Sequence, residues 1–222
     1  MNCRCSRFPV LLDIYQRYLL QANMSDFKSE VSHCYTAGTL ERLVSHSDAS
    51  VRRAAVLALG STGEMSSVRI LVSALRDTDR TVAILAENAL HSIWNRAGDE
   101  SDQRMLQNLS RMVSSGEAAM AVTFASLQLE KTPRFAEIWF QRASAWFELG
   151  EYEYAREDLE TVLDLNPFHF DAYVLLGYVH METGRTVQAL RAFRNALDIN
   201  PGLKNTQLRK RTSAFLRQAR SN

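Results

Sequence analysis

The chain has 222 residues, of which 46% are hydrophobic and 23% charged, and its formal net charge is +1. These proportions are ordinary for a folded, water-soluble protein, and only 4 Pro and 9 Gly interrupt them, so long helices are expected. No stretch reaches about 18 consecutive apolar residues, which predicts that no helix inserts into a membrane.

Residues 1–37 are predicted to be an N-terminal extension with a helix, part of it disordered. The apolar stretch over residues 8–20 is interrupted by Asp13 and Arg17, which makes it a poor signal-peptide core. Met24 directly precedes a Ser-Asp pair of the kind that caps helices. One hypothesis is therefore that the native chain starts at Met24.

Three cysteines, Cys3, Cys5 and Cys34, all lie near the N-terminus. Their odd number and clustering argue against a disulfide framework and favour a reducing compartment. Binding of a soft metal by Cys3 and Cys5 is disfavoured because no second Cys or His pair has matching spacing. With no export signal found, we expect a cytoplasmic, bacterial protein without metal or cofactor.

Residues 38–98 repeat with a period of 31, which aligns Asp48 with Asp79 and Leu59 with Leu90. Each unit is predicted to be a short helix, a turn and a longer helix, with the Asp capping the second helix. The run from Asp48 to Gly60 resembles the short HEAT repeats of bilin lyases, in which an Arg at the position of Arg52 supports a neighbouring turn.

Residues 102–203 repeat with a period of 34, in units 102–135, 136–169 and 170–203. The glycines are predicted to end the first helix of each unit, the alanines to allow close crossing of two helices, and the prolines to stop the second helix. These markers are Gly116, Gly150 and Gly184; Ala121, Ala155 and Ala189; and Pro133, Pro167 and Pro201.

With Trp139 in the middle unit and Gly177 in the third, these residues resemble the tetratricopeptide repeat family; the first unit fits least, since Leu109 stands where the family prefers a small residue. The resemblance implies that the first helix of each unit lines a concave groove. The groove residues so implied are Leu106, Phe140, Gln141, Ser144, Phe147, Val174, Leu175, Tyr178 and Met181.

Acidic residues such as Glu137 are expected at the rim of this groove. The basic clamp with which some members of the family grip a C-terminal carboxylate is not expected, because Leu106, Gln141 and Leu175 occupy its positions. An aromatic, apolar groove suits an amphipathic helix or an extended apolar peptide. The alternative is that tight curvature, or the C-terminal helix of the chain itself, fills the groove.

Residues 204–222 carry six basic and no acidic side chains, whereas residues 102–203 carry nine basic and fourteen acidic ones. A solvated capping helix on an acidic repeat array is the favoured interpretation, and contact with phosphate or an acidic partner is the alternative. Nucleic-acid binding is disfavoured because aromatic residues for stacking are lacking, apart from Phe215.

No catalytic pattern was found. His169 is predicted to be a satisfied loop or surface residue, and the acidic cluster over residues 151–160 to be a solvated helix face. The predicted fold is all-α: a right-handed α–α superhelix of two HEAT-like repeats, three tetratricopeptide units and a capping helix, in one continuous array. The predicted function is that of a non-enzymatic scaffold or adaptor. The alternatives are a bilin-lyase-like or other small-molecule-handling protein, and a regulatory module of a larger assembly.

Overall fold

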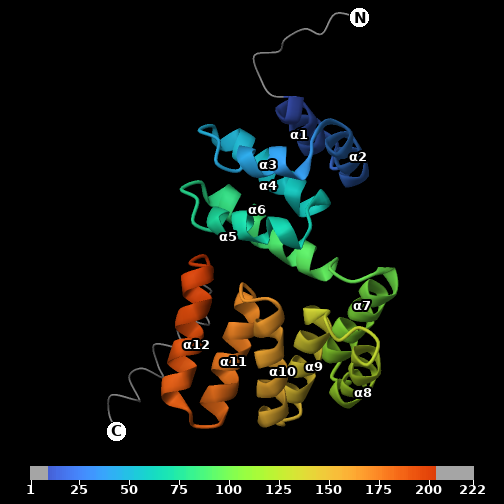
Figure 1. The fold of residues 1–222 in the computed structure, drawn as a ribbon, viewed down its shortest axis with the longest axis vertical. Helices are drawn as coiled ribbons and strands as arrows, with labels where there is room; N and C mark the ends of the chain where they lie inside the picture. Colours follow the sequence, from blue (N-terminus) through green and yellow to red (C-terminus); the bar gives the residue numbers. More distant parts are fainter. Residues whose placement is uncertain (1–9, 204–222) are drawn as a thin grey trace, which may run out of the picture. The chain divides into compact units, whose positions relative to one another are not determined.

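The computed structural model describes residues 10–203 (Figure 1), so the predicted capping helix at 204–222 and the Cys3-Cys5 pair lie outside the described residues. All regular structure in residues 10–203 is helical. The helices are α1 (Val10–Gln21), α2 (Met24–Cys34), α3 (Ala37–Leu43), α4 (Ala49–Thr62), η1 (Met65–Ser67), α5 (Val68–Ala74), α6 (Arg80–Asn95), α7 (Glu100–Ser114), α8 (Ala118–Leu129), α9 (Ala136–Glu148), α10 (Tyr152–Leu165), α11 (Phe170–Glu182) and α12 (Thr186–Ile199).

The chain divides into two compact units, unit 1 over Met1–Ile93 and unit 2 over Trp94–Asn222. The fold is the all-α arrangement of helical hairpins that the two sequence periods predict, with α3/α4 and α5/α6 in the 31-residue region and three hairpins in the 34-residue region. None of the helices within residues 10–203 has the length and the apolar composition needed to cross a membrane.

The segment predicted as an N-terminal extension contains a helical hairpin in unit 1. Helices α1 and α2 contact each other and α4. Four side chains of α1 are buried, namely Leu11, Leu12, Ile14 and Tyr15. Residues 10–34 therefore belong to the folded unit, and a chain that started at Met24 would lack α1 and these core side chains.

The two HEAT-like hairpins of unit 1 are capped as their aspartates predict. Asp48 Oδ1 accepts a hydrogen bond from the Ser50 backbone N–H at 2.7 Å, at the start of α4. Asp79 Oδ1 accepts one from the Val82 N–H at 3.0 Å, at the start of α6. Behind the caps, the repeated apolar positions are fully buried, with Leu59 and Leu90 both 0% exposed.

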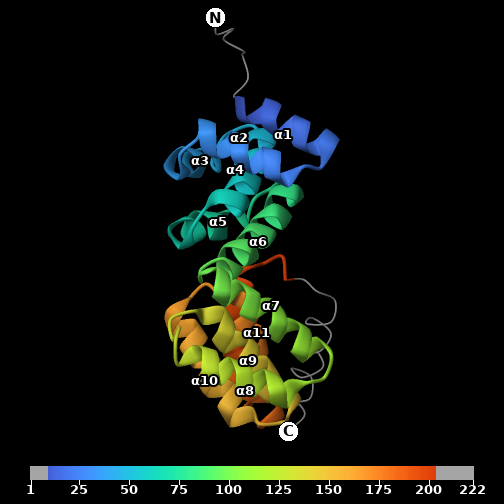
Figure 2. The same cartoon turned by 90° about the vertical axis from the view of Figure 1, so that its right-hand side faces the viewer.

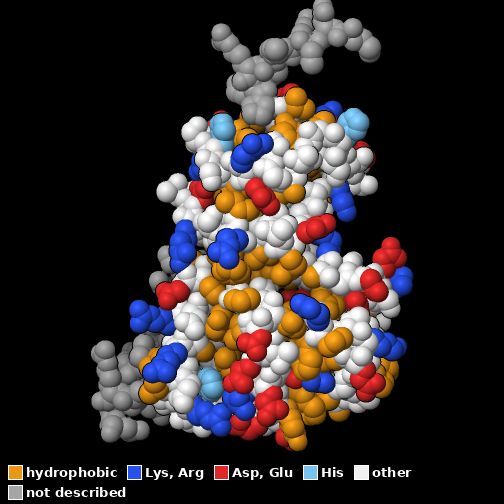
Figure 3. Space-filling view, in the orientation of Figure 1, with side chains coloured by type: hydrophobic (Ala, Val, Ile, Leu, Met, Phe, Trp, Pro, Cys, Tyr) orange, Lys and Arg blue, Asp and Glu red, His pale blue; other side chains and the backbone are white. Residues whose placement is uncertain are grey.

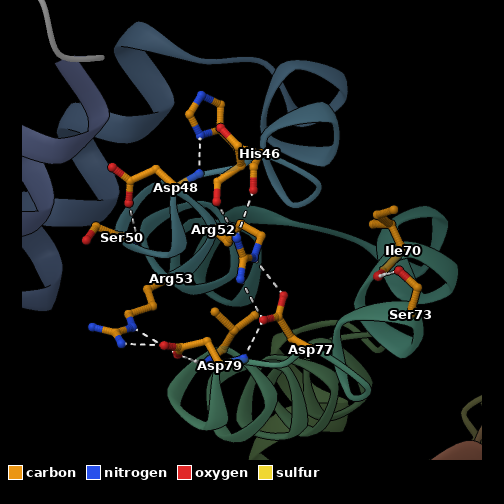
Figure 4. A network of polar contacts seen from close by, with 11 residues as sticks. His46, Asp48, Ser50, Arg52, Arg53, Ile70, Ser73, Asp77 and Asp79 are labelled. Atoms are coloured by element: carbon orange, nitrogen blue, oxygen red, sulfur yellow. Dashed lines mark hydrogen bonds and ion pairs between the residues drawn. The ribbon is translucent and has the colours of Figure 1, made fainter.

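Arg52 joins the turns of the two HEAT-like hairpins (Figure 4). Its Nη1 donates to the carbonyl oxygens of His46 and Ser47 at 2.9 and 3.0 Å, in the turn before α4. Its Nε and Nη2 donate to both carboxylate oxygens of Asp77, in the turn before α6, at 2.7 and 2.8 Å. The support of a neighbouring turn that the HEAT resemblance implies for Arg52 is thus present.

Unit 2 contains three helical hairpins, α7/α8, α9/α10 and α11/α12, whose successive helices pack side by side (Figures 1 and 2). The first helix of each hairpin is followed by a glycine with positive φ: Gly116 at +80°, Gly150 at +78° and Gly184 at +70°. This left-handed conformation is the one that glycine adopts at least cost, so these residues end their helices and reverse the chain.

The second helix of each hairpin has a buried alanine and ends before a proline. Ala121, Ala155 and Ala189 are each 0% exposed. After α10 and α12, the side chains of Asn166 and Asn200 accept hydrogen bonds from the N–H groups two residues on, at 3.2 and 2.9 Å. These Asn-Pro turns, at Pro167 and Pro201, connect each hairpin to the chain that follows.

Candidate functional site

Eight of the nine residues predicted to line a groove lie on α9 and α11, two helices in contact with each other. All eight are half-buried, and we call them the α9–α11 surface: Phe140, Gln141, Ser144, Phe147, Val174, Leu175, Tyr178 and Met181. On each helix they are spaced one, three or four residues apart, which places them along one side. The ninth, Leu106 of α7, is only 6% exposed and belongs to the core with α8 and α9.

A buried histidine supports Phe140 from beneath. The ring of His169 is 1% exposed and lies 4.7 Å from the ring of Phe140 and, in a stacked arrangement, 4.7 Å from the indole of Trp94. Phe170 lies against the other side of this cluster, 5.2 Å from Trp94. The Phe140 ring is therefore fixed by aromatic packing.

His169 lies in the loop before α11 with its ring hydrogen-bonded, as predicted, but it is buried and not at the surface. The placement of Glu137 at a groove rim needs correction. His169 Nδ1 accepts the Ala172 backbone N–H at 3.1 Å and so caps α11. The other ring nitrogen, Nε2, then carries the proton of the neutral ring and donates to Glu137 Oε1 at 3.0 Å. Glu137 is only 6% exposed, so its carboxylate serves this buried bond instead of facing a ligand.

The other aromatic side chains of the surface are also held by neighbours. Phe147 packs against Tyr152 of α10, with ring centroids 5.6 Å apart. Tyr178 meets Phe193 of α12 edge-on at 5.3 Å. Ser144 uses its hydroxyl internally, donating to the Phe140 carbonyl at 2.9 Å. The α9–α11 surface is therefore pre-formed, with each ring partly exposed and partly packed.

Exposed carboxylates of unit 2 lie in two places, at the C-terminal ends of α9 and α11 and along α10. Glu148 and Glu182, at the C-terminal ends of α9 and α11, are exposed. Four acidic residues of α10 form an exposed row at helical spacing, namely Glu153, Glu157, Glu160 and Asp164. In Figure 3, acidic and hydrophobic side chains alternate over the part of unit 2 in which Figure 1 draws α10 and α11.

Asp158, expected to belong to a solvated acidic face of α10, is instead buried at 5% exposure. Arg142 of α9 binds it with two parallel hydrogen bonds of 2.8 and 2.7 Å and reaches Ser126 of α8 at 2.9 Å. The guanidinium also lies over the Trp139 ring, 4.7 Å from its centre. Burial raises the pKa of Asp158, and the Arg142 charge opposes that rise.

The two buried polar pairs were missed in the sequence because each joins residues that are distant in the chain. One signal was present for the second pair. The 34-residue register aligns Asp158 with Ala192 and Arg142 with Leu176, both of them buried. Charged residues at two positions where the third hairpin has buried apolar ones indicate an ion pair in the core of the middle hairpin.

The chemistry available at the α9–α11 surface is that of contact: aromatic rings, aliphatic side chains, one amide and a carboxylate border. Within residues 10–203, no group of three or more His, Cys, Asp or Glu side chains is arranged to hold a metal ion. The residues at the surface suit an apolar ligand whose ends are polar or basic.

Two family models match the chain. The model described as tetratricopeptide repeat matches residues 140–204, and the model described as HEAT repeats matches residues 36–123. The chain thus carries both predicted repeat types. The HEAT match continues through α7 into α8, the hairpin that fits the tetratricopeptide pattern least well.

Two known proteins with tetratricopeptide repeats are similar in sequence. A TPR repeat-containing protein of Rhizobium etli is 28% identical over 132 residues, which cover 60% of this chain and 64% of that protein. Small glutamine-rich tetratricopeptide repeat-containing protein 2 of Saccharomyces cerevisiae is 28% identical over 102 residues, which cover 46% of this chain and 29% of that protein. The chain therefore spans less than two thirds of the length of either relative.

Two solved structures show a similar arrangement of helices at low identity. The first TPR domain of Spaghetti, bound to an HSP90 peptide, has a TM-score of 0.49 and 19% identity, covering 53% of this chain and 91% of its own. The TPR2AB domain of yeast Sti1, in complex with pHSP90, has a TM-score of 0.49 and 14% identity, covering 92% of this chain and 90% of its own.

Proposed function

We propose that this protein is a non-enzymatic scaffold or adaptor that binds a helix or an extended apolar peptide of a partner protein on the α9–α11 surface. The observation that carries the proposal is the row of half-buried aromatic and aliphatic side chains on two adjacent helices, held in place by packing from below. A pre-formed surface of this kind loses little side-chain entropy when a ligand covers it.

The energetics suit a moderate affinity. Phe140 and Tyr178 are already half-buried, so covering what remains of the two rings contributes roughly 1.5–3 kcal/mol before ordering costs. Leu175, Met181 and Val174 add further apolar area. The exposed carboxylates of Glu148 and Glu182 favour a ligand with Lys or Arg beside its apolar residues.

The test distinguishes a loss of binding at the α9–α11 surface from a loss of the fold. Affinity purification with mass spectrometry from the source organism identifies partners of the wild type, and the purified partner is then titrated against variants. Gln141→Arg adds bulk and charge to the surface without removing a packed ring, and it is expected to weaken binding at least tenfold. Phe140→Ala and Tyr178→Ala are expected to act in the same direction.

The matched control is Glu157→Arg, which changes an exposed residue of α10. It is expected to leave the affinity within a factor of two or three. Equal affinities for wild type, Gln141→Arg and Tyr178→Ala would remove the α9–α11 surface from the binding mechanism.

A further inference from the structure

A pocket of about 450 Å³ lies in unit 1, between α1 and the start of α4. The residues that matter for its chemistry are Leu12, Asp13, Tyr15, Leu19, Asp48 and Arg53. The volume lies within the range of sites that bind small molecules or single side chains. The pocket belongs to a different unit from the α9–α11 surface, so it needs its own explanation.

Tyr15 is the first sign that this pocket accommodates a ligand. Its ring is largely buried and its side chain lines the pocket, with only 8% of the residue exposed. The hydroxyl makes no hydrogen bond to any group within residues 10–203, so both its donor and its acceptor sites are available to a molecule in the pocket.

The charged side chains around the pocket determine which sign of charge a ligand there should carry. Arg53 directs Nε and Nη2 at the two carboxylate oxygens of Asp79, at 3.0 and 2.5 Å, so its positive charge is largely compensated (Figure 4). Asp13 and Asp48 form no ion pair with any group in the described part of the chain. The pocket therefore contains two carboxylates that form no ion pair, and they favour cations over anions.

The aliphatic side chains that line the pocket restrict the class of ligand further. Leu12 and Leu19 supply aliphatic surface next to the carboxylates, and Leu19 is 62% exposed. One oxygen of Asp48 already accepts the Ser50 N–H, which leaves the second oxygen for a ligand (Figure 4). This combination matches a cationic head on an aliphatic chain, whose stem packs on leucine while its head meets the carboxylates.

We propose that the α1–α4 pocket binds an alkylammonium or alkylguanidinium group, with Asp13 and Asp48 facing the cation, Tyr15 Oη hydrogen-bonded to it, and Leu12 and Leu19 against its aliphatic stem. Two sources offer this chemistry: a free aliphatic diamine, or the Lys or Arg side chain of a partner protein.

The experiment uses the full-length protein and NMR titration with three probes. These are 1,4-diaminobutane, a blocked Gly-Arg-Gly peptide, and glutarate as the anionic counterpart. Saturable shifts at α1 and the start of α4 are expected with one or both cations and not with glutarate. Tighter binding of the diamine would indicate a free ligand, and tighter binding of the peptide a partner side chain.

Two variants assign the contacts. Asp13→Asn removes one carboxylate, and Tyr15→Phe removes only the hydroxyl; each is expected to weaken binding of the cation at least threefold. Tyr15→Phe is also expected to keep the thermal stability of unit 1, because the deleted hydroxyl makes no hydrogen bond to the described part of the chain. That result, a fold at least as stable with weaker binding, is one that a purely structural tyrosine would not produce.

The charge-matched control is Glu64→Gln, which removes an exposed carboxylate of the same unit outside the pocket. It is expected to leave binding unchanged. The proposal is overturned if no probe gives saturable shifts at the pocket, if glutarate binds as well as the cations, or if Glu64→Gln weakens binding as much as Asp13→Asn does.

Discussion

Gly177 of α11 lies directly against the ring of Phe193 of α12. A Cβ atom at residue 177 would lie 2.4 Å from Cε1 of that ring, closer than two carbon atoms can approach. Helices α11 and α12 can therefore pack at their observed distance only because residue 177 has no side chain. The same exclusion explains how the largest side chain of this core, Phe193, fits at 1% exposure.

In the two preceding hairpins, side chains of other sizes occupy the positions equivalent to Gly177 and Phe193. At the equivalent positions of the 34-residue register, the middle hairpin has Ala143 with Leu159 in one core, and the first has Leu109 with Ala125 in another. All four side chains are 0% exposed. Leu109, which departs from the family pattern, is thus matched by a small residue on the second helix.

Replacing Gly177 with Ala is expected to destabilise unit 2 by about 1–3 kcal/mol, since the rigid Phe193 ring must move to admit the methyl group. All three tryptophans, Trp94, Trp139 and Trp146, lie in unit 2, so their fluorescence during urea unfolding measures this loss. Gln188→Ala, at an exposed position of α12 in the same unit, is the control because it disturbs no packed side chain. An unchanged midpoint for Gly177→Ala would contradict the packing described.

Gly150→Val is expected to destabilise unit 2 by about 1–2 kcal/mol for a different reason. A Cβ at residue 150 meets no atom within 4 Å, so the cost comes only from the φ of +78°, which β-branched residues avoid. Gly150→Asn, which tolerates this conformation better, is expected to lose less. Equal losses for Val and Asn would show that the backbone conformation is not the cause.

Asp158→Ala is expected to cost about 2–4 kcal/mol, because it leaves the half-buried Arg142 guanidinium without its carboxylate. The neighbouring exposed residue gives the control, and Glu157→Ala is expected to stay within about 0.5 kcal/mol of wild type. Urea denaturation followed by tryptophan fluorescence compares the two. A loss below about 1 kcal/mol for Asp158→Ala would mean that the ion pair is dispensable.

Acid is expected to weaken unit 1 through Asp79. The Arg53 hydrogen bonds and the N-cap bond to Val82 lower the pKa of Asp79 to about 2, from about 3.8 in the unfolded chain. A carboxyl with a lowered pKa stabilises the fold fully above pH 3.8, and this contribution disappears as the pH falls through 2. Hydrogen exchange of α6 should therefore accelerate between pH 4 and 2, after correction for intrinsic rates.

The variant Asp79→Asn keeps a capping oxygen but lacks the titrating group. Its α6 protection is expected to be lower than that of wild type at pH 7 and less dependent on pH between 4 and 2. Parallel pH profiles for wild type and Asp79→Asn would assign the acid sensitivity to another group, such as Asp77, whose pKa Arg52 also lowers.

Unit 2 contains a basic group, His180, that is also expected to make stability depend on pH. Burial lowers the pKa of His180 below 6.5, and its Nδ1 has no hydrogen-bond partner in the described part of the chain. A histidine with a lowered pKa favours the fold above pH 6.5, and stability decreases as the pH falls toward the folded-state pKa. Tryptophan-monitored unfolding should show this decrease from pH 7 to 5 in wild type and less of it in His180→Gln.

Much of the fold follows from the sequence because glycine and proline mark helix ends by backbone chemistry alone. Gly150 and Pro167 predict the boundaries of α9 and α10 with no knowledge of packing, and Asp48 predicts the start of α4 in the same way. The helix α1 was not recognised as part of the fold, since it lies outside both periods and its buried face, with Leu11 and Ile14, shows only against α4.

The candidate site was predictable only in part. The register placed Phe140 and Tyr178 on adjacent helices, but it did not reveal how much of each ring is covered from below. The bond from His169 to Glu137 joins residues 32 positions apart, and the pocket at Tyr15 depends on two helices meeting. Such features arise from tertiary contacts, which a repeat period does not encode.

The most direct test of the proposed function is photo-crosslinking with a benzophenone amino acid placed at Gln141 in one preparation and at Glu157 in another, each mixed with the partner found by affinity purification. Both residues lie on helices of the same hairpin, but only Gln141 belongs to the α9–α11 surface. The account predicts crosslinks from position 141 to one apolar or amphipathic segment of the partner, and none above background from position 157. Crosslinks from 157 and none from 141 would contradict it.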